Sequence, residues 1–359
     1  MNKIKCGILG ATGMVGQRYV SLLENHPWFE VTYLAASPRS AGKKYVDAVN
    51  EKWQMSTPIP DSVSDLVVGD ANIVESAIDK CDFVFSALEL EKDLIKKLEF
   101  DYAKSDIPVV SNCSAHRWTK DVPMLLPEVN SSHLDVLSEQ KKSRGFEKGF
   151  VVVKPNCSIQ SYICPMFALE KAGYKIDKAI ITTLQASSGA GYPGVPSLGL
   201  LDNIIPFIGG EEEKSELEPS KILGRVVGGE IVEDNSIKIS AHCNRVPVVD
   251  GHTACVSLSF KEKPIMEEII KAWTNFSSVP QELNLPSAPK KPIIYSTEQD
   301  RPQPRKDRDS EGGMAVTIGR LRECKVFDYR FVGLSHNTIR GAAGGGILNA
   351  ELLKAKNYL

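Results

Sequence analysis

The amino-acid sequence predicts an α/β protein with two domains, the first built on a parallel sheet and the second, an α+β domain, built on a mixed sheet. At 359 residues the chain exceeds one typical domain, and its 42% hydrophobic and 25% charged residues are ordinary for a globular protein. Roughly the first hundred residues alternate short apolar runs with helical patterns, as in βαβ units. After residue 178 the apolar runs are separated by long connections, which indicates a second sheet.

Apolar periodicity gives the expected elements in order. In the first domain the expected strands are Ile4–Leu9, 31–35, 67–68, 83–86, 107–110 and 150–153, and the expected helices are 14–25, 91–104 and 158–172. In the second we expect strands at 180–184, 237–241, 253–260, 314–318 and 327–332, with an irregular connection over 284–307. Small residues at helical spacing over 336–355 predict a helix packed on the first domain. The predicted domains are therefore 1–156 with 336–359, and 157–335.

Charge and cysteine usage exclude several classes of protein. Lys and Arg total 43 against 45 Asp and Glu, with no basic block, so neither nucleic acid nor a membrane surface is expected as a partner. The eight cysteines are scattered without a CxxC pair, which indicates reduced thiols, and no metal site is predicted. No run of about 18 apolar residues occurs, and the N-terminus breaks at glycine before a signal-peptide core. We expect a soluble, cytoplasmic protein.

The earliest chemical signal is a glycine-rich loop between an expected strand and an expected helix. Gly10, Gly13 and Gly16 are spaced G-x-x-G-x-x-G. In the first βα turn of a Rossmann unit such glycines let the backbone approach a pyrophosphate, which lies on the positive helix N-terminus. A tight turn with close helix packing is the alternative, but the strand, loop and helix context favours a dinucleotide. The predicted cofactor residues here are Gly10, Thr12, Gly13, Met14 and Val15.

The end of the second expected strand decides between NAD and NADP. NAD sites usually place an acidic residue there, whereas this chain has Ser37, Arg39 and Ser40, with Lys43 and Lys44 close by. The planar guanidinium of Arg39 and the two serine hydroxyls suit a 2′-phosphate. The alternative is that these are solvated loop residues. NADP is the predicted cofactor.

Two cysteines compete for the role of nucleophile, because each follows an expected strand in an Asn-Cys-Ser sequence. Cys157 precedes an expected helix, whose dipole would lower the pKa of the thiol. Cys113 lies at a strand end too and is the internal competitor. Cysteines in apolar runs are more often buried core residues, and this applies to Cys6, Cys81, Cys164 and Cys255. The sequence favours Cys157.

The candidate base is His252, because an enzyme that makes and breaks thioesters needs a proton acceptor near the sulfur and imidazole is the usual one. His252 ends the segment 245–252, RVPVVDGH, which has a polar residue at each end of a short apolar turn. The five other histidines are alternatives, and a lone histidine is more often structural than catalytic.

Together these features resemble the aspartate-semialdehyde dehydrogenases, specifically their archaeal and fungal type. The resemblance covers essentially the whole chain and lies in GATGMVGQR at 10–18, ASPRSAGK at 36–43, SNCSAHR at 111–117, PNCS at 155–158, TLQASSGAGYPGVPS at 183–197, NIIPFIGGEEEK at 203–214, NRVPVVDGH at 244–252 and HNTIRGAAGGG at 336–346. It implies a second domain like that of glyceraldehyde-phosphate dehydrogenase. It also implies a homo-dimer or homo-tetramer assembled through that domain.

The reaction that the resemblance implies is the NADPH-dependent reductive dephosphorylation of β-aspartyl phosphate to aspartate semialdehyde, in the biosynthesis of lysine, threonine, methionine and isoleucine. Cys157 would attack the acyl phosphate, His252 would manage the proton and Gln185 would orient the acyl intermediate. The implied substrate residues are Arg245 for the α-carboxylate, Glu211 for the α-ammonium, Arg117 and Lys214 for phosphate, and Asn156 beside the nucleophile. Without the resemblance, Glu211 and Lys214 would be interpreted as a solvated helix start.

For the cofactor, the resemblance adds Ser86, Ser188 and Gly189 near the ribose or nicotinamide and Asn337 toward the carboxamide. Ser188 and Gly189 could equally form a flexible turn whose glycine only permits the backbone path. One residue departs from the family pattern: Lys154 stands before Pro-Asn-Cys, where relatives often have a small or polar residue.

Two other functions compete with this interpretation. An acyl-CoA reductase acting on malonyl-CoA or succinyl-CoA would use the same fold, cysteine and NADPH, but it needs no site for an α-amino group, and Glu211, Lys214 and Arg245 stand where an amino-acid substrate would need them. A catalytically inactive NADP-binding sensor would keep the glycine-rich loop and lose Cys157 or His252. Both residues are present.

Overall fold

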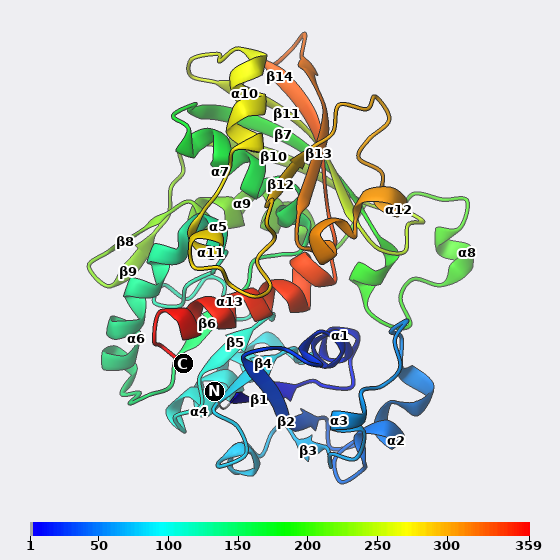
Figure 1. Cartoon of the computed structure of the whole chain (residues 1–359), viewed down its shortest axis with the longest axis vertical. Coiled ribbons are helices and arrows are strands. Elements are labelled where there is room, and N and C mark those ends of the chain that lie inside the picture. Colours follow the sequence, from blue (N-terminus) through cyan, green and yellow to red (C-terminus); the bar gives the residue numbers. More distant parts are fainter. Residues whose placement is uncertain (1–2) are drawn as a thin grey trace.

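The computed structural model describes residues 3–359 and contains two six-stranded sheets. The first occupies the lower half of the molecule in Figure 1 and the second the upper half, with the C-terminal helix α13 (Gly344–Ala355) between them. Within the described residues no helix is long and apolar enough to cross a membrane.

The first sheet is entirely parallel, with the strand order β3-β2-β1-β4-β5-β6. Its strands are β1 (Ile4–Leu9), β2 (Phe29–Ala36), β3 (Gly69–Asp70), β4 (Phe83–Ser86), β5 (Val109–Ser111) and β6 (Val151–Val153). This is the order of a Rossmann fold, in which ligands bind beyond the carboxyl ends of the strands where the order reverses. Here that reversal lies between β1 and β4.

Helices cover both faces of the parallel sheet. Apolar side chains of α1 (Met14–Leu23) and α13 share one buried cluster with the strands, and those of α4 (Lys92–Lys104) belong to the cluster on the opposite face. The other helices of the first half are α2 (Tyr45–Val49), α3 (Asp61–Ser64), α5 (Pro127–Asn130) and α6 (Leu137–Arg144). The packing of α13 supports the assignment of 336–359 to the first domain, although the exact domain boundaries stay a prediction.

The second sheet is mixed, with the order β10-β7-β11-β14-β13-β12, parallel pairs at its two edges and antiparallel pairs between them. Its strands are β7 (Ile176–Gln185), β10 (Lys238–Arg245), β11 (His252–Phe260), β12 (Ile293–Tyr295), β13 (Val316–Glu323) and β14 (Tyr329–Ser335). The prediction of a parallel and a mixed sheet is confirmed. A separate hairpin joins β8 (Arg225–Val227) to β9 (Glu230–Val232).

Helices cover one face of the mixed sheet, and part of the other face is exposed. Side chains of α7 (Ile163–Lys171) and α10 (Met266–Thr274) share the core cluster with its strands. On the other face Ile180 is 42% exposed and Cys255 is also exposed. The expectation that Cys255 is a core residue was wrong, because its position in β11 points away from the covered face.

Several elements differ from those expected. The predicted helix 158–172 is a 3₁₀ turn at Ser158–Ser161 followed by α7, and the predicted helix 336–355 begins with a wide turn at Ile339–Ala343 before α13. β12 lies inside the connection expected to be irregular. The remaining helices, none of them assigned from periodicity, are α8 (Ser197–Leu200), α9 (Glu211–Ile222), α11 (Val279–Glu282) and α12 (Pro304–Asp307).

Candidate active site

The candidate active site lies between the two sheets, where β6 ends and the chain turns toward α7. Pro155 follows the strand and Cys157 comes two residues later, at the mouth of a cavity of about 320 Å³. The cavity is lined by residues from both halves of the chain, among them Met14, Val15, Arg18, Glu89, Asn112, Arg117, Asn156, Cys157, Ser188, Gly189, Asn337 and Gly341. The helix start that was predicted to bind a cofactor therefore faces the predicted nucleophile.

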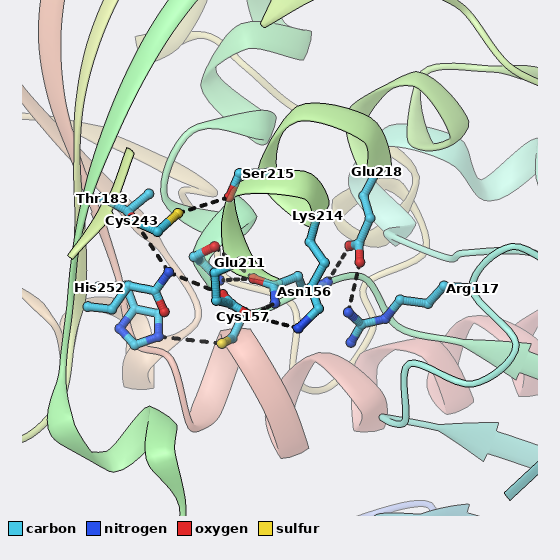
Figure 2. Close-up of polar contacts among 12 residues, drawn as sticks. Arg117, Asn156, Cys157, Thr183, Glu211, Lys214, Ser215, Glu218, Cys243 and His252 are labelled. Atoms are coloured by element: carbon cyan, nitrogen blue, oxygen red, sulfur yellow. Dashed lines mark hydrogen bonds and ion pairs between the residues drawn. The ribbon is translucent and has the colours of Figure 1, made fainter. Parts of the chain in front are cut away.

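Cys157 and His252 are in contact, although 95 residues separate them in sequence. The Sγ atom of Cys157 lies 3.4 Å from Nε2 of His252, the first residue of β11 (Figure 2). The other ring nitrogen, Nδ1, accepts a hydrogen bond from the backbone N–H of Ala186 at 3.0 Å. A backbone N–H can only donate, so Nδ1 carries no proton and the proton of the neutral ring is on Nε2. His252 therefore presents a donor to the sulfur.

The pKa values of this pair are set by burial. Burial, with smaller contributions from Arg245 and His336, lowers the pKa of His252 to about 3. Desolvation and the nearby Glu211 raise the pKa of Cys157 to about 11. The predicted lowering by a helix dipole is not found, because a single 3₁₀ turn follows Cys157 and a short turn carries little dipole. Nearby cations lower the pKa of the thiol in turn.

Glu211, the first residue of α9, is the centre of a buried polar cluster beside the nucleophile. Its carboxylate accepts hydrogen bonds from Lys214 Nζ at 2.8 Å, Asn156 Nδ2 at 2.9 Å and Gln185 Nε2 at 3.1 Å (Figure 2). Glu211 thus joins three other predicted substrate or catalytic residues in one hydrogen-bonded cluster. The interpretation of this helix start as merely solvated was wrong, because Glu211 is buried.

Arg117 is held in place by a carboxylate that was not predicted from the sequence. Its Nη1 donates to Glu218 Oε1 at 2.8 Å and its Nε to the carbonyl oxygen of Lys154 at 3.0 Å. The second oxygen of Glu218 accepts the backbone N–H of Asn156 at 2.7 Å. Glu218 follows Glu211 by seven residues on α9, which places both on one helix face, and this spacing was the signal available in the sequence.

Arg245, the last residue of β10, lies near His252. Its Nη1 donates to the carbonyl oxygen of Ala186 at 2.7 Å. A Cβ atom at Gly189 would lie 2.9 Å from this Nη1 and 3.1 Å from Cε1 of His252. Glycine at 189 therefore lets the loop approach both side chains, which explains its place in the site better than chain flexibility does.

A second cavity, of about 220 Å³, lies over the glycine-rich loop. Among its lining residues are Gly10, Thr12, Gly13, Ser37, Arg39 and Glu89, and Glu89 also lines the first cavity. Gly10 has φ +79°, and a Cβ there would lie 2.3 Å from the carbonyl oxygen of Ala87. Gly13 precedes α1 without a side-chain cap, so the first N–H groups of that helix are free to bind an anion. These residues fit the pyrophosphate of a dinucleotide.

The remaining predicted cofactor residues have different positions. Asn337 lines the first cavity, donates from Nδ2 to Ser188 Oγ at 2.8 Å and accepts the backbone N–H of Gly251 at 2.8 Å. Ser40 lies in the turn that begins at Ser37 but lines neither cavity. Ser86 also lines neither: it is fully buried with Oγ 3.5 Å from the sulfur of Cys113.

Two family models match the chain. The NAD-binding domain of semialdehyde dehydrogenases matches residues 5–137, and the dimerisation domain of semialdehyde dehydrogenases matches residues 166–340. The first match covers β1 to β5 from residue 5 on, the second covers the whole mixed sheet, and β6 lies between the two matches.

Individual relatives match over the full length. A protein of Methanothermobacter thermautotrophicus named aspartate-semialdehyde dehydrogenase is 47% identical over 352 residues, which are 98% of this chain and 99% of the relative. The crystal structure of aspartate semialdehyde dehydrogenase with NADP from Candida albicans is 43% identical, superposes with a TM-score of 0.89 and covers 100% of both chains. A Vibrio cholerae structure of 23% identity shares the fold, with a TM-score of 0.75. The chain belongs to the aspartate-semialdehyde dehydrogenase family.

Proposed function

We propose that this protein converts β-aspartyl phosphate to aspartate semialdehyde with NADPH, through a thioester on Cys157. The observation that carries the proposal is the contact of 3.4 Å between Cys157 Sγ and His252 Nε2, beside a cavity that the first turn of α1, after the glycine-rich loop, also lines. The names of the relatives point to the same reaction and do not favour an acyl-CoA reductase. The pathway is the synthesis of aspartate-derived amino acids.

The charges around Cys157 match a small substrate that carries a carboxylate, an ammonium and a phosphate. Arg245 is the proposed partner of the α-carboxylate and Glu211 that of the α-ammonium. Arg117 lines the cavity beside Cys157 and is the proposed phosphate ligand, together with Lys214. Both cations are paired with carboxylates, Arg117 with Glu218 and Lys214 with Glu211, so phosphate binding must share or replace these contacts.

In the first chemical step the thiolate of Cys157 attacks the acyl carbon of the substrate. A C–S bond forms, and the bond between the acyl carbon and the phosphate oxygen breaks. Inorganic phosphate takes the electrons of that bond and leaves toward Arg117 and Lys214. The amide of Gln185, held by Glu211, is placed to orient the acyl group. Asn156 accepts the backbone N–H and the hydroxyl of Ser158 through Oδ1, and these bonds fix the turn that presents the sulfur.

The second step needs a hydride at the thioester carbon, which NADPH supplies when it is bound. The carbonyl oxygen then becomes negative, and the Nε2–H of His252 is the donor placed to stabilise it. When the C–S bond breaks, the aldehyde is released and the thiolate of Cys157 regains its hydrogen bond from His252. In this role His252 acts as a donor, which agrees with the proton on Nε2 deduced from the contact with Ala186.

Ser37, Arg39 and Ser40 are the proposed ligands of the 2′-phosphate of NADP. The pyrophosphate would lie over the glycine-rich loop at Gly10 and Gly13. The Candida albicans relative was crystallised with NADP.

The open face of the mixed sheet is the proposed interface of a homo-oligomer, since the family model that covers it describes a dimerisation domain. A cytoplasmic location stays a prediction.

The test is the reverse reaction, NADP reduction by aspartate semialdehyde with phosphate or CoA supplied separately. We expect turnover that depends on inorganic phosphate, because a compact anion suits a site with two cations. Turnover that CoA supports better than phosphate would overturn the proposal and favour the acyl-CoA reductase.

A further inference from the structure

Arg18 is a cation of the catalytic cavity that the proposed reaction does not use. It ends the segment GATGMVGQR and lies on α1, four residues after Met14 and three after Val15. All three residues line the cavity of about 320 Å³ that Cys157 also lines. Because positions three and four apart share a helix face, the face of α1 that borders the cavity carries this guanidinium.

The neighbours of Arg18 on α1 fix the orientation of this face. Gln17 is buried and donates from Nε2 to two backbone carbonyl oxygens, each at 2.9 Å. Tyr19 is fully buried, and its hydroxyl accepts Nδ2 of Asn112 at 2.6 Å. A rotation of the helix that turned Arg18 away from the cavity would break these hydrogen bonds.

Asn112 connects α1 to Arg117, the proposed phosphate ligand. Its side chain contacts Tyr19, and its carbonyl oxygen accepts a hydrogen bond from Arg117 Nη2 at 3.3 Å. Arg18, Asn112 and Arg117 all line the same cavity. The guanidinium groups of Arg18 and Arg117 therefore border one space beside the nucleophile.

The charge of Arg18 is not neutralised by a carboxylate in contact with it. Its Nε is buried without a hydrogen-bond partner, and Arg18 forms no ion pair within residues 3–359. Burial lowers the pKa of Arg18, and the nearby Asp250 and Asp309 oppose this lowering. Asp309 is paired with Arg308 at 3.7 Å, and Glu89, the acidic residue among those that line the cavity, is exposed. A guanidinium in this position is costly unless an anion contacts it.

The two phosphate ligands already proposed bring no net positive charge. Arg117 is paired with Glu218 and Lys214 with Glu211, each at 2.8 Å. The charge of Arg245 is assigned to the α-carboxylate of the substrate. A phosphate group is close to a dianion at pH 7, and a dianion beside two neutralised cations would stay largely uncompensated. The phosphate therefore needs a cation that has no carboxylate partner.

We propose that Arg18 is a third ligand of the substrate phosphate and supplies the positive charge that the two paired cations lack. It would contact the phosphate of β-aspartyl phosphate before the thioester forms, and inorganic phosphate in the reverse reaction. Its planar guanidinium can donate two parallel hydrogen bonds to phosphate oxygens. The proposal deepens the proposed function and rests on it, because it names a further ligand of the same substrate.

The test measures the binding of inorganic phosphate to the full-length enzyme by ³¹P NMR, with saturating NADP and without aspartate semialdehyde. Bound NADP fills the pyrophosphate site, so the added phosphate reports the site beside Cys157. In Arg18→Met, which removes the charge, we expect the dissociation constant of phosphate to rise about 10-fold or more. Arg18→Lys, which keeps the charge without the planar fork, should lie between the two. The affinity for NADPH, measured by fluorescence titration, should change much less.

Arg308→Met is the matched control. Arg308 lies beside the same acidic residues, since its Nη1 donates to the carbonyl oxygen of Asp250 at 3.1 Å and its Nε is paired with Asp309. It lines neither cavity of the site. Its removal takes away an equal charge and should leave the phosphate affinity unchanged. If Arg18→Met fails to fold, Arg18→Gln gives the same reading.

An unchanged phosphate affinity in the folded neutral variants would overturn the proposal. An equal loss of NADPH affinity would also overturn it, because Arg18 would then bind the cofactor. A lack of phosphate binding in the unmodified protein would contradict the proposed function, and this proposal with it. Because the measurement needs no turnover, the failure of the proposed function and the failure of Arg18 as a ligand give different results.

Discussion

Two cysteines stand in the same sequence, Asn-Cys-Ser, at the ends of the neighbouring parallel strands β5 and β6, and only one of them faces the cavity. Cys113 is enclosed, with its sulfur 3.5 Å from Ser86 Oγ and 3.4 Å from the carbonyl oxygen of Leu88. Burial and the nearby Glu99 raise its pKa to about 12. Cys157 instead contacts the imidazole of His252, and nearby cations lower the pKa of its thiol.

The comparison shows that the motif alone does not make a nucleophile. The asparagine before each cysteine is used differently: Asn112 donates to the hydroxyl of Tyr19 at 2.6 Å, whereas Asn156 donates to Glu211 and so joins the polar cluster. What differs is the partner that the rest of the chain brings to each strand end. β6 lies at the edge of its sheet, where the second half of the chain can reach it.

The largest effect should separate the two cysteines directly. We expect Cys157→Ser to lose about 10³-fold or more in turnover while it still binds NADPH, because a serine hydroxyl has no accessible anion. Cys113→Ser should retain most of the activity, since its thiol is buried away from the cavity. Steady-state kinetics and NADPH fluorescence titration measure both. The reverse pattern would transfer the role to Cys113.

Removal of the imidazole should have the next largest effect. We expect His252→Asn to lower turnover by about 10²–10⁴-fold, since a positioned donor is lost from the oxyanion. Because the folded pKa of His252 is about 3, the ring is neutral throughout the assay range. The wild-type profile of kcat/KM against pH should therefore have no inflection near 6.5 from this group. Such an inflection, absent from the variant, would show that His252 titrates there.

The lowered pKa of His252 should also make the free energy of unfolding depend on pH. An unfolded histidine binds its proton below about pH 6.5, whereas buried His252 binds one only near pH 3. Between these values the unfolded state holds more protons, so the free energy of unfolding falls as the pH is lowered. Urea unfolding at several pH values should give a shallower dependence in His252→Asn. An equal dependence in both proteins would contradict the depressed pKa.

The predicted strands and the chemical residues lie in local patterns, which is why they could be found from the sequence. Alternating apolar runs gave the parallel sheet, and the glycine spacing gave the loop before α1. Other features depend on contacts between distant segments. The charge state of His252 follows from the backbone of Ala186, and the burial of Lys154 follows from Gly345, which is 191 positions further along the printed sequence. No local pattern indicates either contact.

Ser86, a predicted cofactor residue, also shows that a local pattern does not fix the direction of a side chain. It ends β4, as expected, but its side chain points into the core against Cys113. A strand end fixes where a residue lies, and the final turn of the backbone decides which way its side chain points. Glu218 was missed for the opposite reason, since an acidic residue on a charged helix is usually solvated.

A smaller effect should separate the phosphate site beside Cys157 from the cofactor site over the glycine-rich loop. We expect Arg117→Ala to raise the phosphate concentration needed for half-maximal rate strongly, and to leave NADP affinity nearly unchanged, because Arg117 lies beside Cys157 and not over the glycine-rich loop. Glu218→Gln, which keeps the side-chain shape, should have a smaller effect. Equal losses in phosphate and NADP affinity would show that Arg117 supports the whole site.

The smallest expected effect concerns the choice of cofactor. Arg39→Ala should weaken NADPH binding by about 10-fold or more and NADH binding much less, since only NADPH has the 2′-phosphate. Fluorescence titration with both nucleotides measures the two affinities. Equal weakening would mean that Arg39 supports the loop and does not contact the phosphate.

The central claim is that the reaction passes through a thioester on Cys157, and a single-turnover measurement tests it most directly. Enzyme mixed with aspartate semialdehyde and NADP, with phosphate omitted, should produce a burst of about one NADPH per active site and then stop. The peptide that contains Cys157 should carry the added mass of an aspartyl group, and phosphate should release it. A reaction without a burst, or an aspartyl group found on Cys113, would contradict the account.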